Sequence, residues 1–526
     1  MLKSKQFLSG RPQRVLGLLF IWILAATIPA AAQNQNKKGA TPEQKTARYF
    51  DAIRTRPLEL HAFLRGMPKG GDLHSHLMGA VYAETYIQWA AETKPDLCVD
   101  MKTMAPSSSK DAPCGDEKSD RPPASLALKD NALYRRLVDA WSIRNWQYSG
   151  QSGRDRFFDA FGKFDLATEG RFGEMIAEVA SRAALGRVSY LELLLGPDNR
   201  KSRDIGRQLK WSEDLGKMRE ELLAKGIAAA VEEARRTFDQ AEARKRELLK
   251  CDTPQADAGC RVTIRYIFQV GRNNPPEQAF AQMVAAMETA NVDPRLVALN
   301  LVQAEDTRTA MSNFSLQMRM LDYLRAIYPK AHITLHAGEL APGLVPPEGL
   351  RFHIRESVRK GRAERIGHGV AVMYEDDPFA LLREMAQRNV MVEICLSSND
   401  VILGVRGKQH PLALYLKYGV PVALATDDEG ILRTDITREY LKAAEEHGLR
   451  YTQLKAMART SLEHAFIAGA SFWKDAKRFV PVPRCATAGS DKGGLSSGCR
   501  QFLESNEKAR LQWDLERAFA EFEGRY

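Results

Sequence analysis

Two short segments of the chain place histidines and a carboxylic acid at spacings that suit catalysis at a metal ion. His74 and His76 lie two residues apart in a β-rich run, so on a strand both side chains leave the same face. His336 is followed three residues later by Glu339, and Gly338 between them lets the backbone turn. The alternative for the first pair is two hydrogen-bonded core histidines, whereas a strand end with a base and an acid suits a metal ligand beside a proton carrier.

Two further segments add a histidine and a pair of carboxylates. His368 stands between two glycines in Arg365–Gly369, and alone it could be a loop histidine. Asp427 and Asp428 follow an apolar run, where adjacent carboxylates repel each other unless a cation neutralises one of them. The alternative for this pair is an N-cap for the next helix.

The four segments together are far more specific than any one of them. Three imidazole nitrogens and one carboxylate, all at predicted strand ends, are typical of a mononuclear zinc site with a position open for water. The predicted metal ligands are His74, His76, His336 and Asp427. The remaining acid–base groups, which we expect around the metal, are Glu339, His368 and Asp428.

The elements that must position these groups alternate between strand and helix. Eight β-rich runs are separated by segments with helical periodicity, and this alternation predicts an α/β fold, the (β/α)8 TIM barrel. The predicted strands are 71–77, 188–195, 262–270, 296–302, 332–336, 365–367, 390–396 and 420–426.

Three segments add to the minimal barrel. Thr41 and Pro42 predict the start of an N-terminal helix that runs to about Arg65. Residues 98–131 are rich in Ser, Pro, Asp and Lys, which predicts a disulfide-pinned surface loop inserted after the first strand. Residues 481–499 predict a second disulfide-closed loop, followed by a C-terminal helix from about 500 to 523.

The N-terminal residues have the pattern of a secretory signal peptide. Residues 1–14 are basic without an acid, 15–29 are apolar, and three alanines precede Gln33. The apolar run is shorter than the roughly 20 residues that a membrane span needs, so we expect cleavage near Ala32 rather than a stable membrane anchor. This division predicts a signal peptide at 1–32, a linker at 33–40 and a single barrel domain at 41–526.

Cysteine usage and charge agree with export. Six of the seven cysteines form close pairs that an oxidising compartment would join, and Cys395, in an apolar run, is expected to be a buried free thiol. The net charge of +10 is spread along the chain and partly lies in the leader, so we expect no nucleic-acid partner. The predicted disulfides are Cys98–Cys114, Cys251–Cys260 and Cys485–Cys499.

The motifs, in this order, resemble those of the adenosine deaminase family of metal-dependent hydrolases. The resemblance covers roughly Met67 to His464 and rests on MPKGGDLHSHL, HAGE, RIGHG and TDD. The leader, the insertion and the LVQAEDT segment are most similar to the secreted branch, the adenosine deaminase-related growth factors.

The resemblance implies a zinc ion, one per chain, and roles for the residues around it. Glu339, protonated, would donate to N1 of a purine, while His368 and Asp428 would orient and deprotonate the attacking water. The implied reaction converts adenosine or deoxyadenosine to inosine or deoxyinosine and ammonia. The implied substrate-binding residues are Met78, Phe161, Phe164, Gln303 and Gly338.

Three positions depart from the family pattern and affect the substrate rather than the chemistry. Met78 replaces an acidic residue that binds the ribose, Gln303 replaces a glycine beside the purine, and Asn300 replaces an aspartate. Two alternatives therefore stay open. One is the same chemistry on adenine or a modified adenine nucleoside, and the other is an extracellular growth-factor-like binding protein. We expect a secreted or periplasmic protein, with a small-molecule purine nucleoside as partner and a homodimer as an allowed assembly.

Overall fold

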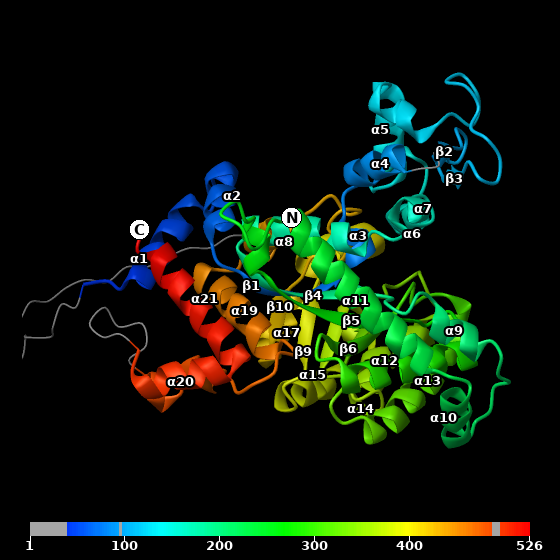
Figure 1. Ribbon diagram of the computed structural model, residues 1–526. Coiled ribbons are helices and arrows are strands. Elements are labelled where there is room, and N and C mark those ends of the chain that lie inside the picture. The colour runs from blue at the N-terminus through cyan, green and yellow to red at the C-terminus, as the bar shows by residue number, and fades with distance from the viewer. Residues whose placement is uncertain (1–38, 94–96, 487–494) are drawn as a thin grey trace, which may run out of the picture. The chain divides into compact units, whose positions relative to one another are not determined.

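The structure is a computed structural model that describes residues 39–93, 97–486 and 495–526 (Figure 1). The predicted signal peptide and residues 33–38 of the predicted linker lie outside the described residues. Residues 39–41 belong to neither a helix nor a strand, and Pro42–Tyr526 forms one compact unit.

Eight parallel strands form the centre of this unit, and each pairs with its neighbours in chain order. The predicted α/β TIM barrel is confirmed, with each predicted strand found within a few residues of its expected bounds. The strands are β1 (Gly70–His76), β4 (Val188–Leu195), β5 (Thr263–Gly271), β6 (Leu296–Val302), β7 (His332–Ala337), β8 (Arg365–His368), β9 (Met391–Ile394) and β10 (Val422–Leu424).

The sheet closes just beyond the last strand. Ser75 of β1 forms a parallel bridge with Asp427, three residues after the end of β10. The His76 N–H donates to the Asp427 carbonyl at 2.8 Å, and the Asp427 N–H donates to the His74 carbonyl at 2.8 Å. The seam of the barrel therefore brings the first and the last predicted metal-binding segments side by side.

Helices between the strands surround the barrel (Figure 1). In α13, for example, the Thr307 hydroxyl accepts from the Ala310 N–H at 3.2 Å as the N-cap, and Phe314, Met318 and Leu321 are buried at helical spacing. The surrounding helices are α8 (Phe172–Leu185), α9 (Lys201–Gly206), α10 (Leu215–Ala224), α11 (Ala228–Leu248), α12 (Pro276–Val292), α13 (Arg308–Ile327), α14 (His353–Arg359), α15 (Pro378–Gln387), α16 (Leu396–Leu403), α17 (Leu412–Tyr418), α18 (Ile436–Glu445) and α19 (Tyr451–His464).

The predicted terminal helices are each divided in two. The N-terminal one consists of α1 (Pro42–Ile53) and α2 (Pro57–Gly66), because Pro57 has no N–H and its ring excludes a continuous helix. The C-terminal one consists of α20 (Ser497–Ser505) and α21 (Glu507–Glu523). Buried Lys455 of α19 joins these ends of the chain, donating to Glu43 at 2.7 Å and to Glu523 at 2.5 Å.

The disulfide-pinned insertion after the first strand contains short elements within its loops. It contains the hairpin β2 (Leu97–Val99) and β3 (Pro106–Ser108) and the 3-10 turn η1 (Ala124–Leu128). Cys98 and Val99 are fully buried, and the Arg121 guanidinium donates to Ser107 and to the carbonyl of Ala112. Helix α3 (Leu77–Ala80) directly follows β1 beside the barrel, and Figure 1 places the hairpin near α4 (Ala83–Glu92), α5 (Asn131–Ala140), α6 (Gly153–Phe161) and α7 (Asp165–Thr168).

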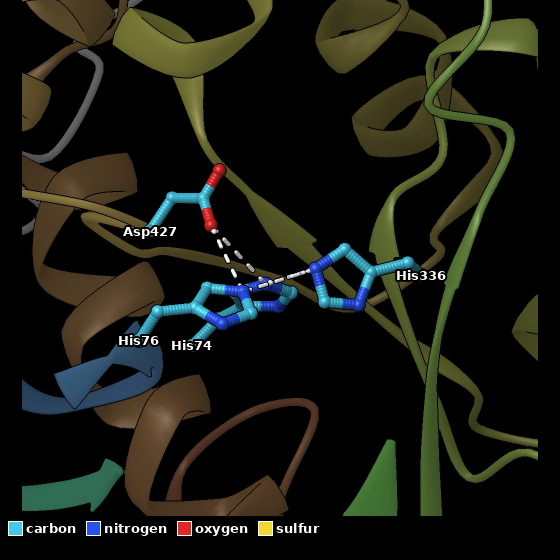
Figure 2. Close-up of side chains that lie close together, drawn as sticks. All are labelled: His74, His76, His336 and Asp427. Carbon is cyan, nitrogen blue, oxygen red and sulfur yellow. Dashed lines mark hydrogen bonds and ion pairs between the residues drawn. The ribbon is translucent and has the colours of Figure 1, made fainter. Parts of the chain in front are cut away.

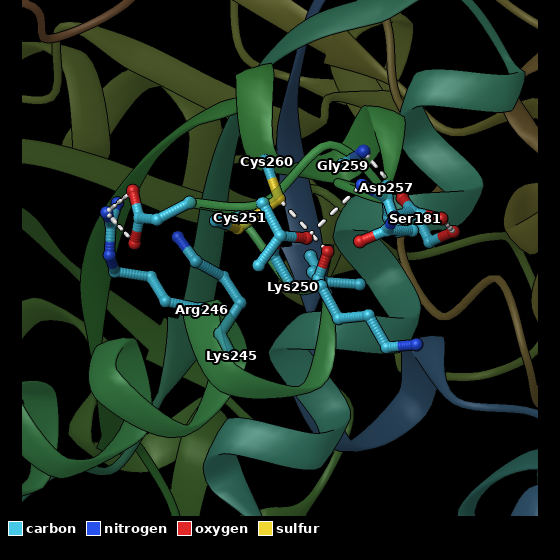
Figure 3. Close-up of a disulfide and its surroundings, with 12 residues drawn as sticks. Ser181, Lys245, Arg246, Lys250, Cys251, Asp257, Gly259 and Cys260 are labelled. Carbon is cyan, nitrogen blue, oxygen red and sulfur yellow. Dashed lines mark hydrogen bonds and ion pairs between the residues drawn. A yellow bond between two sulfur atoms is a disulfide. The ribbon is translucent and has the colours of Figure 1, made fainter.

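All three predicted disulfides are confirmed, and Cys395 is a buried free thiol. Figure 3 shows Cys251–Cys260, which ties the turn after α11 to the start of β5. Beside it, the Asp257 carboxylate accepts from the Gly259 N–H at 2.7 Å and from the Ser181 hydroxyl at 3.1 Å, so the bridge is anchored to α8. Within the loop predicted at 481–499, residues 487–494 lie outside the described part.

None of the helices in the described ranges has the length and apolar character needed to cross a membrane.

Candidate metal centre and active site

Three strand ends bring the four predicted ligands to one point. His74 and His76 point from the same face of β1, His336 lies near the end of β7, and Asp427 lies at the seam after β10. Figure 2 shows the three imidazole rings and the carboxylate converging. All four residues are buried, as expected for the inner side of a barrel at its carboxyl end.

The spacing of the four ligand atoms fits a tetrahedral metal. The His336 Nε2 lies 3.1 Å from the Nε2 atoms of both His74 and His76, and Asp427 Oδ1 lies 3.5 Å and 3.4 Å from those same two atoms. Metal–ligand bonds of about 2.0–2.1 Å at tetrahedral angles separate ligand atoms by roughly 3.3–3.4 Å. The pocket between these atoms therefore has the size of a zinc-like cation.

Hydrogen bonds on the far side of each ring decide where its proton lies. His74 Nδ1 donates to Glu393 at 2.6 Å, and His336 Nδ1 donates to the side-chain oxygen Oδ1 of Asn300 at 2.8 Å. The Gln269 side-chain nitrogen Nε2 lies 2.7 Å from His76 Nδ1, and exchange of the amide oxygen and nitrogen would let the oxygen accept a proton from Nδ1 instead. A neutral imidazole whose single N–H is at Nδ1 has a lone pair at Nε2, so in this tautomer all three Nε2 atoms can face a metal ion at the centre.

The carboxylate in this cluster also lacks a hydrogen-bond donor. Among the described residues, Asp427 Oδ1 is buried without a hydrogen-bond partner, and three lone pairs face it. Such a cluster is costly unless a cation fills its centre. The donor set, two or more imidazoles with one carboxylate, fits a divalent first-row metal.

The pKa values of the ligands follow from burial and from two carboxylates. Burial lowers the pKa of His336 well below its ordinary value and that of His76 to about 3. For His74, burial acts in the same direction, but the neighbouring carboxylates of Asp427 and Glu393 outweigh it and raise the pKa to about 10. The same two carboxylates that attract a proton to His74 would attract a metal cation in its place.

Three acid–base groups border the metal centre, as predicted. His368 Nε2 lies 3.8 Å from Glu339 Oε1 and 3.9 Å from Asp427 Oδ2. Burial, with the charges of Asp427 and Glu305, raises the pKa of Glu339 well above its ordinary value, which favours its protonated form. Burial and Asp427 likewise raise the pKa of Asp428. The arrangement thus supplies a neutral acid and an adjacent carboxyl group beside a cation site.

A known protein family contains most of the residues of this site. The family model for adenosine deaminase matches residues 148–472, well over half of the chain. The chain belongs to the adenosine deaminase family. The matched range includes His336, Glu339, His368 and Asp427, whereas His74 and His76 precede it and join the site through the fold.

Curated relatives in the adenosine deaminase family match a limited part of the chain. An adenosine deaminase of Serratia proteamaculans is 38% identical over 137 residues, which are 26% of this chain and 38% of that protein. One of Klebsiella pneumoniae is 39% identical over 138 residues, again 26% of this chain and 38% of that protein. The chain thus spans under two fifths of the length of these relatives. Membership of the growth-factor branch stays a prediction.

Solved structures give a weaker likeness. The N6-methyl-AMP deaminase of Arabidopsis thaliana is 20% identical, with 80% of this chain and 96% of that chain covered and a TM-score of 0.46. The adenine deaminase of Arthrobacter aurescens is 17% identical, with 76% and 94% covered and a TM-score of 0.48. Neither score supports a conclusion about this chain.

Three residues of this deaminase-family site have a left-handed backbone. Gln303, His368 and Asp427 have φ values of 80°, 66° and 62°. Such conformations cost a non-glycine residue on the order of 1–3 kcal/mol and concentrate at functional sites. Gly338 has a φ of 69° without that cost, and a Cβ there would lie 2.7 Å from Ile354, so this turn requires glycine.

The predicted substrate-binding residues occupy different environments. Gln303 is exposed, and its amide oxygen accepts from the Asn273 N–H at 3.1 Å, so its NH2 group points away from that bond. Met78 is half-buried, and its carbonyl accepts from the Tyr86 hydroxyl at 2.6 Å. Phe164 has no exposed surface and stacks on Tyr86 with ring centres 4.6 Å apart. Contact of these side chains with a substrate stays a prediction.

Helix α6, which carries half-buried Phe161, lies over the carboxyl ends of the strands. Gly153 at its start packs against the Val401 carbonyl of α16, which follows β9. Arg154 forms an ion pair with Asp306, in the loop after β6, at 2.5 Å. The start of the helix therefore lies between α16 and the loop after β6, which agrees with a cover over the site.

Several buried polar residues that orient the site were not among the predicted site residues. Glu393 accepts from His74 and from the Thr334 hydroxyl at 2.9 Å, and it forms an ion pair with Arg365 at 2.7 Å. Glu305 accepts from the backbone N–H groups of Gly338 and Glu339 at 3.1 Å and 2.8 Å and fixes that turn. Glu393 could have been recognised from the sequence, because it is a carboxylate inside an apolar strand.

Proposed function

We propose that the protein is an exported, zinc-dependent hydrolytic deaminase that converts adenosine or deoxyadenosine to inosine or deoxyinosine and ammonia. The observation that carries the proposal is the convergence of three imidazole nitrogens and a buried carboxylate beside Glu339, whose pKa is raised by burial. Membership of the adenosine deaminase family supports the reaction class.

His74, His76, His336 and Asp427 would hold one zinc ion. When bound, zinc supplies Lewis-acid chemistry that makes water nucleophilic near neutral pH. The carboxyl group of Asp428 is placed to take the proton of that water, and Glu339 to donate its proton to N1 of the purine as C6 is attacked. The C–O bond formed at C6 and the C–N bond broken there convert the 6-amino group to a 6-oxo group and release ammonia.

The same chemistry on adenine or on a modified adenine nucleoside is the second candidate. Met78 has a thioether, which accepts hydrogen bonds only weakly, and Gln303 presents an amide donor. A purine nucleoside is the proposed partner. Export is supported by the leader sequence and by three disulfides, which persist in oxidising compartments.

The test is ammonia release by the purified protein, with its zinc content measured, from adenosine, deoxyadenosine, adenine, methylthioadenosine and AMP. His336→Ala should lose both zinc and activity. His332→Ala is the matched control, because His332 lies on the same strand but pairs with Glu364 at 2.9 Å and contacts none of the ligands. A zinc-loaded protein that releases ammonia from no 6-aminopurine would contradict the proposal and favour a binding protein.

A further inference from the structure

A chain of buried hydrogen bonds lies behind His368 and takes no part in the reaction proposed above. His410, at the start of the segment that leads into α17, accepts the Leu412 backbone N–H on Nδ1 at 3.2 Å. Its Nε2 lies 3.0 Å from Asn399 Oδ1, and Asn399 Nδ2 lies 3.0 Å from His368 Nδ1. Asn399 is fully buried and His410 nearly so.

The backbone amide at one end fixes the direction of every bond in this chain. The Leu412 N–H can only donate, so His410 Nδ1 carries no proton, and the single N–H of a neutral ring is on Nε2. Burial lowers the pKa of His410 to about 3, so the ring is neutral. His410 Nε2 therefore donates, and Asn399 must turn its oxygen toward it.

The orientation of Asn399 in turn sets the tautomer of His368. With its oxygen facing His410, Asn399 presents its NH2 group to His368 Nδ1, which can only accept. The hydrogen of the His368 ring is then on Nε2, the atom that faces Glu339 and Asp427. Among the described residues, this Nε2 is buried without a hydrogen-bond partner.

We propose that Asn399 and His410 are positioning residues that hold His368 as the Nε2–H tautomer, so that His368 gives the reacting oxygen a hydrogen-bond donor instead of a base. The proposal rests on the deaminase function proposed above. It revises the predicted role of His368, because a nitrogen that already carries a proton cannot accept one. The proton of the attacking water then goes to Asp428.

The same tautomer restricts metal binding near the site. His368, Cys395 and Asp427 form a second group of close potential ligands. A nitrogen that carries a hydrogen has no lone pair to give a metal, so His368 is not a ligand in that group. The cation site is thereby confined to His74, His76, His336 and Asp427.

Long-range 1H–15N NMR of the zinc-loaded protein, labelled at histidine, tests the tautomer without any substrate. The His368 resonances are identified by their loss in His368→Asn. We expect a neutral ring protonated on Nε2, and a ring protonated on Nδ1 would overturn the proposal. Because this measurement needs no turnover, it stands even if the substrate assay finds no deaminase activity.

Asn399→Asp tests the consequence for catalysis. A carboxylate of nearly the same shape accepts from both rings, so at pH 9 the hydrogen of His368 should move to Nδ1. Turnover should fall by roughly 10²-fold to 10⁴-fold with zinc content unchanged. Losses of this size occur when a hydrogen-bond donor to the transition state is removed or when a catalytic histidine adopts the wrong tautomer. Two results for Asn399→Asp would overturn the proposal. One is unchanged turnover although His368 has lost its Nε2 hydrogen, and the other is a neutral His368 ring that still carries its hydrogen on Nε2.

A matched pair at His410 separates orientation from packing. In His410→Gln, the side-chain NH2 replaces the Nε2–H donor to Asn399, whereas His410→Leu fills similar space without a donor. We expect the Gln variant to keep the His368 tautomer and more turnover than the Leu variant, with KM similar in both. Equal turnover and the same single tautomer in both variants would show that His410 only fills space.

Discussion

Gly79 offers a test of Asp428 that leaves the catalytic groups themselves unchanged. Gly79 lies in α3, directly after the β1 ligands, and its carbonyl accepts the Gly430 and Ile431 N–H groups at 2.9 Å and 3.0 Å. A Cβ added to Gly79 would lie 1.5 Å from Asp428 Oδ1 and 2.4 Å from its Cγ. In Gly79→Ala, the carboxyl group must therefore move by about 2 Å to reach ordinary contact distance.

That displacement sets the expected loss of activity. A misplacement of about 1 Å in a catalytic group can cost roughly 10²-fold in rate. We therefore expect Gly79→Ala to lower turnover by at least about 10²-fold. The metal ligands do not touch the new methyl group, so zinc content should stay near the wild-type value. Gly196→Ala is the matched control, because a Cβ at this exposed glycine meets no atom within 4 Å.

The assay is steady-state ammonia release with zinc analysis of each variant, including Asp428→Ala alone and combined with Gly79→Ala. If the methyl group acts through Asp428, it should add little once that carboxylate is gone, since two changes on one contact are not additive. Full turnover in Gly79→Ala would refute the proton-accepting role of Asp428. A further large loss in the double variant would show that the methyl group acts by another route.

Four other outcomes follow from the site and the fold. Glu339→Gln should keep zinc and lose turnover by roughly 10²-fold to 10⁴-fold, as for a general acid, and unchanged turnover would assign the proton to another group. Gln303→Gly should raise KM for adenosine with zinc retained, because it removes an amide donor; improved adenosine turnover would mean that the side chain crowds the nucleoside. Burial raises the pKa of Glu439 from 4.5 to about 7, so between these pH values the folded protein retains a proton that the unfolded chain releases. The free energy of unfolding therefore falls as the pH rises through this range. Glu439→Gln should flatten that part of the pH profile in denaturant titrations, and an unaltered profile would mean that other groups cause it. Peptide mapping without reduction should find Cys395 free and three links, and a link to Cys395 would contradict its burial; the expected links are Cys98–Cys114, Cys251–Cys260 and Cys485–Cys499.

The barrel and its metal ligands could be predicted because both depend on local signals. Short apolar runs bounded by glycine and charged residues define strands, and a chain of alternating strands and helices has few ways to fold. The carboxyl ends of such strands gather at one face, so His74, His336 and Asp427 had to meet. The break in the N-terminal helix could also have been predicted from the sequence, because Pro57 lies inside the predicted helix.

The supporting residues could not be predicted, because their roles depend on neighbours that are distant in sequence. Glu393 meets His74 across 319 residues, and Asn399 is functional only because His410 and His368 lie on its two sides. The hairpin in the insertion was missed for a related reason. Its Ser- and Pro-rich composition is typical of loops, yet Arg121 supplies hydrogen bonds that order it.

The seam between β1 and the segment after β10 sets the order in which the protein can mature. Asp72 and Thr426 meet there across a sequence separation of 354 residues, beside ligands contributed by both ends of the barrel. A chain still emerging from the ribosome or a translocation channel lacks its last strand and has no complete ligand set. Metal capture by these residues must therefore follow closure of the barrel. A metal ion that binds these residues would bind only the closed form, and it would stabilise the seam by a free energy that grows with the logarithm of the free metal concentration above the Kd. Metal supply in the compartment where folding ends would then be part of the folding equilibrium.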